Sequence, residues 1–96
     1  MITLEQKVRP HAEVVDTKLD DGEVVLLQLE NKMYYSLNQA GERVWQGLKD
    51  GLSLTEISRK LQEEFDVDSE RADSSVLDLV EELCDEKLAA PETRST

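Results

Sequence analysis

The alternation of apolar and polar positions predicts three short strands in the first forty residues. Residues 13–19, EVVDTKL, are rich in β-branched side chains, which favour extended backbone. Residues 23–30, EVVLLQLE, carry apolar side chains on both faces, and residues 32–37, KMYYSL, again alternate. Turn signals separate the runs, with Gly22 after two aspartates and Asn31 before the third run. The segment therefore predicts an antiparallel sheet built from two hairpins.

From Asn38 onward the apolar positions recur with helical spacing and predict three helices. Asn38 is a good N-cap for a helix over residues 39–49. Ser53 and Glu56 have the spacing of a capping box, so a second helix is expected to begin there. A third amphipathic run covers residues 69–87. The predicted fold class is α+β, winged helix-turn-helix-like, with a three-stranded antiparallel sheet followed by three helices.

The length and the pattern together predict one domain with a short irregular segment at each end. Ninety-six residues allow a single small core. Residues 1–12 show little pattern and contain Pro10, so we expect a loosely ordered lead-in. The domain is expected over residues 13–90, and residues 91–96 are expected to form a mobile tail.

The third predicted helix has an apolar arc that covers about half of its circumference, more than the ~100° that packing on a small core requires. Its central stripe is expected in the core and consists of Ala72, Val76, Leu79 and Leu83. Its flank consists of Leu77, Val80, Cys84 and Leu88. The flank fits the wall of a binding groove, but periodicity alone fits deeper burial or a homodimer contact equally well.

The charge of the chain narrows its range of partners. The 22 acidic and 11 basic residues give a net charge of −11, which opposes binding to nucleic acid phosphates and to anionic membranes. The exposed positions of the third helix are mostly acidic, although the order of elements would suit a DNA-binding regulator. One cysteine, no signal peptide and no long apolar run fit a soluble cytoplasmic protein.

Catalytic groups are scarce in this sequence, and we expect no enzyme activity, metal or cofactor. His11 is the only histidine and lies in the lead-in, while Cys84 lies in the apolar arc of a helix. Asp66, Asp68 and Glu70 alternate like the start of a calcium loop, but the glycine and the terminal glutamate of such a loop are absent. Capping and helix-dipole roles explain these carboxylates.

An ordered set of residues between 13 and 90 resembles the PqqD-like family, the recognition elements of systems that modify ribosomally made peptides. The set begins with Tyr35, Leu37 and Asn38 and continues with Trp45, Leu48, Gly51, Ile57, Leu61, Phe65, Val76, Leu79 and Leu83. Two features depart from the pyrroloquinoline quinone type. The third strand reads YYS where a Pro-Glu pair is usual, and Ser75 stands where an aspartate is typical. The YYSLN form is more similar to the stand-alone proteins of lasso peptide systems.

The resemblance implies a function in which the leader of a precursor peptide adds as a strand to the third strand, in a groove beside the third helix. The chain would then present the precursor to partner enzymes: a leader peptidase and a cyclase, or in other systems a radical SAM enzyme. For several of the residues that carry the resemblance, burial in the core is an alternative to contact with the peptide. The peptide-binding residues expected from this resemblance are Lys32, Met33, Tyr34, Tyr35, Ser36, Asp73, Leu77, Val80 and Cys84. A winged-helix regulator of transcription and a homodimerisation module are the alternatives, and the oligomeric state is left open.

Overall fold

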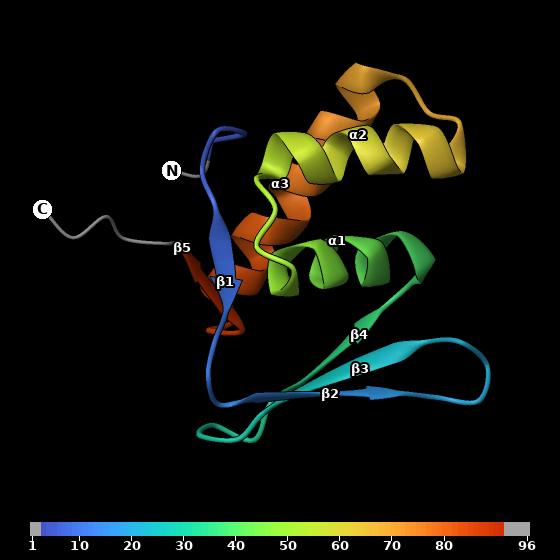
Figure 1. Ribbon diagram of the computed structural model, residues 1–96. Coiled ribbons are helices and arrows are strands. Elements are labelled where there is room, and N and C mark those ends of the chain that lie inside the picture. The colour runs from blue at the N-terminus through green and yellow to red at the C-terminus, as the bar shows by residue number, and fades with distance from the viewer. Residues whose placement is uncertain (1–2, 92–96) are drawn as a thin grey trace, which may run out of the picture.

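The computed structural model describes residues 3–91 and has the predicted α+β architecture (Figure 1). Three antiparallel strands form one sheet in the order β2-β3-β4, and β1 pairs with β5 in a second, two-stranded sheet. The elements are β1 (Val8–Pro10), β2 (Val14–Lys18), β3 (Val24–Gln28), β4 (Tyr34–Leu37), α1 (Gln39–Lys49), α2 (Leu54–Phe65), α3 (Ser69–Asp85) and β5 (Ala89–Pro91).

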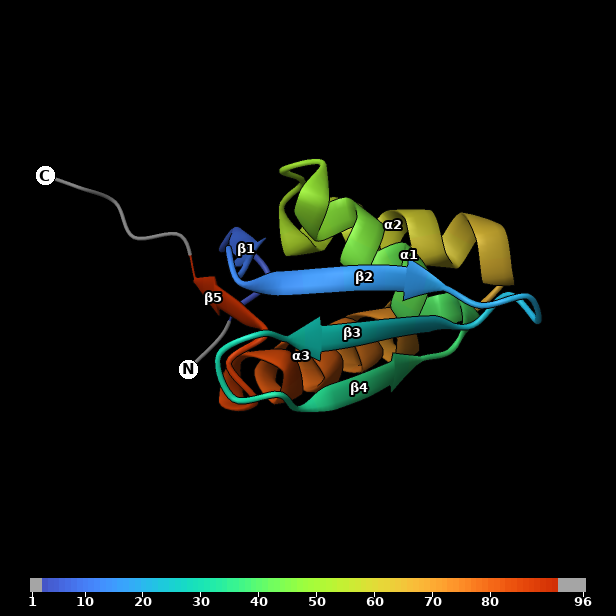
Figure 2. The same ribbon diagram turned by 90° about the horizontal axis from the view of Figure 1, so that it is seen from below.

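All three helices lie on one side of the three-stranded sheet. Figure 1 shows the sheet below and the helices above it, and Figure 2 shows β2, β3 and β4 in front with no element covering their outer face. β3 is central, and β2 and β4 form the two edges. The fold therefore leaves one sheet face and two strand edges available, with α3 running behind β3 and β4 (Figure 2).

Local capping signals place the helix starts as the sequence predicts. The Asn38 side chain accepts a hydrogen bond from the Gly41 N–H at 2.8 Å, and Ser53 and Glu56 form the reciprocal capping box. Asp68 caps α3 by accepting from the Arg71 N–H. These side chains satisfy backbone donors that a helix cannot pair internally, which is why the chain switches to helix at these points.

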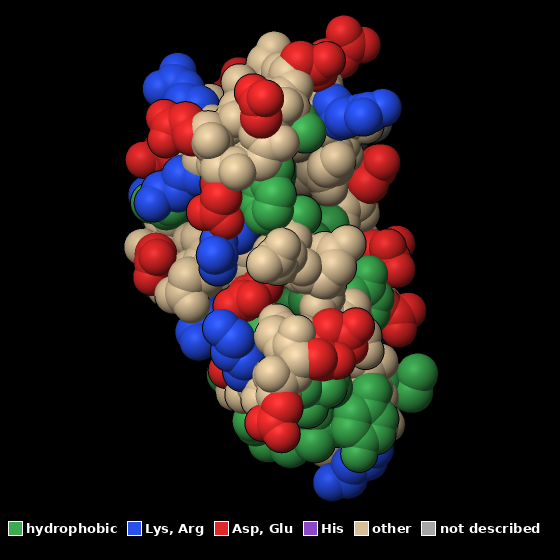
Figure 3. Space-filling view, turned by 90° about the vertical axis from the view of Figure 1, so that its right-hand side faces the viewer, with side chains coloured by type: hydrophobic (Ala, Val, Ile, Leu, Met, Phe, Trp, Pro, Cys, Tyr) green, Lys and Arg blue, Asp and Glu red, His purple; other side chains and the backbone are tan. Residues whose placement is uncertain are grey.

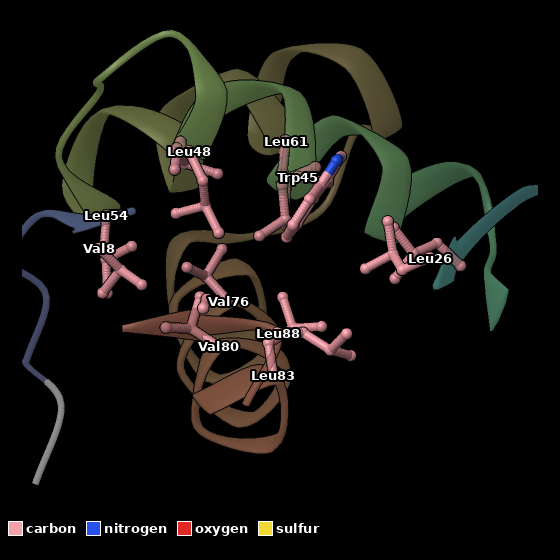
Figure 4. Packing of buried hydrophobic residues seen from close by; sticks show 14 of the residues in the cluster. Val8, Leu26, Trp45, Leu48, Leu54, Leu61, Val76, Val80, Leu83 and Leu88 are labelled. Atoms are coloured by element: carbon pink, nitrogen blue, oxygen red, sulfur yellow. The ribbon is translucent and has the colours of Figure 1, made fainter. Parts of the chain in front are cut away.

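The core is a continuous cluster between the inner face of the sheet and the three helices (Figure 4). Leu26, in the central strand, is fully buried and faces the helices. The cluster also contains Trp45 and Leu48 of α1, Leu54, Ile57 and Leu61 of α2, and Val76, Val80 and Leu83 of α3.

The expectation of a loosely ordered lead-in is wrong for part of residues 1–12. Val8 is buried in the core, and Val8–Pro10 pair in antiparallel register with Ala89–Pro91. Before this strand, the Leu4 carbonyl accepts a hydrogen bond from the Thr55 N–H. The predicted mobile tail, 91–96, lies outside the described residues except for Pro91, which ends β5. Two segments from opposite ends of the chain thus pair with each other and cover one side of the core.

A polar link fastens the edge strand β2 to α1. The Trp45 Nε1–H donates to Asp16 Oδ2 at 2.7 Å, and Lys49 Nζ lies 2.9 Å from the same oxygen. The Lys49 hydrogen bond is the main cause that lowers the pKa of Asp16, and the Trp45 hydrogen bond adds to it. The ionised carboxylate is therefore the form that the folded state stabilises.

We predict that Asp16→Asn lowers the free energy of unfolding near neutral pH by about 1 kcal/mol, after allowance for solvent screening. Because folding lowers the pKa of Asp16, its contribution is fully present above the usual value of 3.8 and disappears as pH falls through the lowered folded value. The gap in stability between wild type and variant should thus close on acidification. Urea denaturation across a pH series measures this, and a gap independent of pH would contradict it.

At Gly47, α1 packs tightly against Ile57 of α2. A Cβ at this position would lie 2.5 Å from Ile57 Cγ1 and 2.9 Å from Ile57 Cδ1, and Ile57 is buried. We predict that Gly47→Ala destabilises the fold by about 1–3 kcal/mol from overpacking, despite a helix-propensity gain of about 1 kcal/mol. Gly41→Ala, whose nearest contact is 3.2 Å, is the control and should cost less in the same thermal melts. Equal stability of Gly47→Ala and wild type would contradict the close packing.

Candidate peptide-binding site

The two edges of the sheet differ in their readiness to pair with another strand. β2 presents two charged side chains toward the helices: Asp16 is held by α1, and Lys18 lies 3.5 Å from Glu42. Charges that point inward on an edge strand discourage further pairing. β4 has no charged residue within Tyr34–Leu37. The β4 edge is therefore the one suited to accept an extended peptide.

The hydrogen-bond pattern identifies which backbone groups of β4 face outward. Antiparallel partners alternate between pairs that exchange hydrogen bonds and pairs that do not. The Gln28 N–H donates to the Met33 carbonyl at 2.9 Å, so Tyr35, two residues further, also directs its backbone groups toward β3. Tyr34 and Ser36, which alternate with these, direct their N–H and C=O groups to the open edge.

A hollow of about 260 Å³ borders this edge. It is lined by Tyr35, Ser36 and Leu37 of β4, and by Ser75 and Leu79 on the side of α3. The remaining lining comes from the first turns of α1 and from α2, through Asn38, Ala40, Gly41, Val44 and Leu61. Its lining mixes aliphatic side chains with hydroxyl and amide groups. Such a lining suits one side chain of a bound strand.

Tyr35 joins β4 to the acidic side of α3. Burial is the largest cause that raises the pKa of Tyr35 to about 12, followed by a hydrogen bond to Glu82 and the charges of Glu82 and Glu86. The phenol therefore remains protonated and donates to the Glu82 carboxylate. The half-buried Tyr35 ring thus lies near the acidic side of α3.

The five strand residues expected to bind peptide lie together at this edge. Met33 and Tyr34 are exposed, Tyr34 to 72% of its surface. Ser36 is exposed and Tyr35 half-buried, while Lys32 occupies the β3–β4 turn with a φ of 62°. The structure thus places these residues where a paired strand would run, and contact with a peptide stays a prediction.

The four expected residues on α3 are placed differently. Val80 is fully buried in the core, so its expected role as an exposed groove wall is wrong (Figure 4). Asp73 accepts a hydrogen bond from the Ser58 hydroxyl of α2, and thus lies on the side of α3 that faces α2. Leu77 and Cys84 follow Asp73 on that same flank, about 160° and 140° around the helix from Leu79. None of the four lines the hollow beside β4.

Sequence reasoning missed the α3 residues that do line the hollow, Ser75 and Leu79. Leu79 was expected in the central stripe of the core but is only half-buried. Another missed residue, Gln28, is buried and donates from Nε2 to the Lys87 carbonyl at 2.6 Å. This bond ties the end of β3 to the segment after α3 and so helps to set the position of α3 beside the sheet. An isolated Gln within an apolar strand was the only signal of it.

The side chains in and around this site offer little for catalysis. Burial, followed by the charges of Asp85 and Glu81, raises the pKa of the Cys84 thiol, which disfavours the reactive thiolate. His11 uses Nδ1 to accept the Glu13 N–H in a turn. Within residues 3–91 no group of His, Cys, Asp or Glu side chains is arranged to hold a metal ion. In the same range, no helix is long and apolar enough to cross a membrane.

Two solved structures share this fold closely. One, described as TbiB1 in complex with the TbiA(beta) leader peptide, is 30% identical, has a TM-score of 0.78 and covers 92% of this chain and 99% of its own. The other, described as lasso peptide synthetase B1 complexed with the leader peptide, is 28% identical, has a TM-score of 0.81 and covers 88% of this chain and 99% of its own. Among curated proteins none gives a significant match.

The model of one protein family also matches residues 23–89, a segment that runs from β3 to β5. That family is described as coenzyme PQQ synthesis protein D, PqqD. The matched segment contains the open β4 edge, the hollow and the whole of α3, and it makes up well over half of the chain. This protein belongs to the PqqD family.

Proposed function

We propose that this protein is a non-catalytic recognition protein that binds the leader peptide of a ribosomally made precursor, in lasso peptide biosynthesis. The observation that carries the proposal is the open β4 edge beside a hollow, on a fold shared with two proteins described as leader-peptide complexes. The leader would add as a strand to β4 and would place an apolar side chain in the hollow. Main-chain hydrogen bonds would supply affinity, and the hollow would supply selectivity.

The proposal extends to partners and location. The bound precursor would be delivered to a leader peptidase and a cyclase, which act in the cytoplasm where the precursor is made. The chain itself would supply no catalytic group, in keeping with the raised pKa of Cys84. The lasso assignment rests on the likeness to a structure described as lasso peptide synthetase B1 complexed with the leader peptide, whose chain is covered almost completely.

A DNA-binding role is not favoured by the surface of α3. Asp78, Glu81 and Asp85 are exposed on this helix, and the chain carries a net charge of −11. A helix that entered the major groove with these side chains would face phosphates with like charge.

The strand-addition geometry is tested by proline substitution at matched positions on the two edges. Tyr34→Pro removes an N–H that points to the open β4 edge, so leader affinity should fall by about tenfold or more. Lys18→Pro, which removes an N–H that points to the β2 edge by the same alternation, is the control and should leave affinity unchanged. Calorimetry with a synthetic leader peptide measures binding, and circular dichroism verifies folding. Equal affinity of folded Tyr34→Pro and wild type would show that the leader binds elsewhere.

The role of the hollow is tested by two leucines on opposite sides of α3. Leu79→Ala should weaken leader binding by about 1–2 kcal/mol, or five- to thirtyfold, because Leu79 lines the hollow. Leu77→Ala makes the same truncation on the flank away from β4 and should leave binding unchanged. Peptide titration gives both affinities, and urea denaturation separates binding effects from stability. If Leu77→Ala weakened binding more than Leu79→Ala did, the groove would lie on the other flank of the helix.

A further inference from the structure

Gln28 is a polar side chain at a position that otherwise suits an apolar one. It lies on the inner face of β3, two residues after the buried Leu26, and only 1% of its own surface is exposed. Burying an amide costs free energy unless its donor and its acceptor are both hydrogen-bonded. An apolar side chain of similar size would fill the same space without that cost. The specific contribution of Gln28 therefore lies in its hydrogen bonds.

One set of these bonds closes the turn that leads into β4. Gln28 Oε1 accepts from the Glu30 N–H at 2.9 Å, and the Gln28 carbonyl accepts from the Lys32 N–H at 2.8 Å. The Gln28 N–H donates to the Met33 carbonyl at 2.9 Å. Lys32 has a φ of 62°, in the left-handed region that residues other than glycine occupy at a cost. Gln28 thus holds a strained turn closed and fixes where β4 begins.

The other bond of the amide reaches the end of α3. Lys87 follows that helix with a φ of 61°, at the position where helices usually place a glycine. The Lys87 N–H donates to the Cys84 carbonyl. The Leu88 N–H donates to the Leu83 carbonyl, which completes the hydrogen-bond pattern of such a helix end. Because Gln28 Nε2 donates to the Lys87 carbonyl at 2.6 Å, the same amide holds this second strained residue.

The two anchored segments lead into the two walls of the candidate site. The sheet lies at the lower end of the molecule in Figure 3, where hydrophobic side chains gather on the surface, and β4 supplies its open edge. The opposite wall is α3, which supplies Ser75 and Leu79 to the hollow. This helix continues from Leu79 to Asp85, about 9 Å of helix rise, so a displacement of its end also moves Leu79. The Gln28 amide therefore connects the positions of both walls.

The spacing between these walls decides what the site can bind. A strand added to β4 would lie about 4.8 Å from it. Main-chain hydrogen bonds keep their strength over only a few tenths of an ångström in donor–acceptor distance. A change in the spacing between β4 and α3 would therefore prevent one peptide from pairing with the edge and filling the hollow at the same time.

We propose that Gln28 is a positioning residue for leader recognition, because its amide fixes the spacing between β4 and α3. The inference rests on the proposed function, in which the leader pairs with β4 beside the hollow. Gln28 is buried on the inner face of the sheet, so a peptide on the open edge does not touch it. Its effect on binding passes through the turn at Lys32 and the helix end at Lys87.

Gln28→Met tests the proposal, because it removes both side-chain hydrogen bonds and keeps a side chain of similar size. We expect calorimetry to show that the folded variant binds a synthetic leader peptide about fivefold more weakly than wild type, or worse. In the free variant, amide hydrogen exchange measured by NMR should accelerate at Glu30 and Leu88 more than it does in α1.

Ser58→Ala is the matched control. Ser58 is also buried, with 1% of its surface exposed, and it does not line the hollow. Its hydroxyl donates to Asp73 and accepts from Gln62 Nε2, so it joins α2 to α3. We expect Ser58→Ala to lower the midpoint of urea unfolding, as Gln28→Met does, but to keep the wild-type affinity for the leader.

Trimethylamine N-oxide separates positioning from stability, because it favours the folded state without restoring the lost hydrogen bonds. Gln28→Met should bind more weakly than wild type even where the osmolyte restores its unfolding midpoint. Wild-type affinity under that condition, or equal weakening by Ser58→Ala, would overturn the proposal, since Gln28 would then act on stability alone. A Gln28→Met chain that stays unfolded in the osmolyte would overturn it too. Failure of the wild type to bind the leader is a different result and would contradict the proposed function itself.

Discussion

Burial of one sheet face against three helices is the constraint on which the rest of this structure depends. Leu26, in the central strand, is completely enclosed by this packing. Because the sheet has only three strands and all helices lie on one side, residues 3–91 leave the other face and both edges without cover (Figure 2). The features that bear on binding are therefore direct results of how a small domain hides its apolar surface.

The two edges are distinguished by chemistry and not by position. On β2, the inward-pointing carboxylate of Asp16 is held by Trp45 and Lys49. This contact fastens the strand to α1, and the inward charge discourages another strand from pairing with that edge. On β4, Tyr35 reaches α3 through Glu82, and no charged group blocks the edge. The polar link on β2 thus protects one edge, while the β4 edge stays free of charged side chains beside the helix that lines the hollow.

Local signals explain why most of the fold was predictable. Strands β2 to β4 follow from alternation, and the helices follow from caps such as Asn38 and the Ser53–Glu56 box, which act over only a few residues. β1 and β5 were missed because each has only three residues and each ends in a proline. Their pairing joins positions about 80 residues apart in the sequence, a relation that no local pattern reports.

The sequence by itself determined that α3 is amphipathic with a wide apolar arc, that residues 32–37 alternate as a strand, and that the surface is acidic. Only the tertiary structure decided which part of the arc faces the core and which part faces the hollow. Val80 entered the core and Leu79 came to line the hollow, the reverse of the assignment from periodicity. Spacing gives the angles between side chains on a helix, but the rotation of the whole helix about its axis is set by packing against α1, α2 and the sheet.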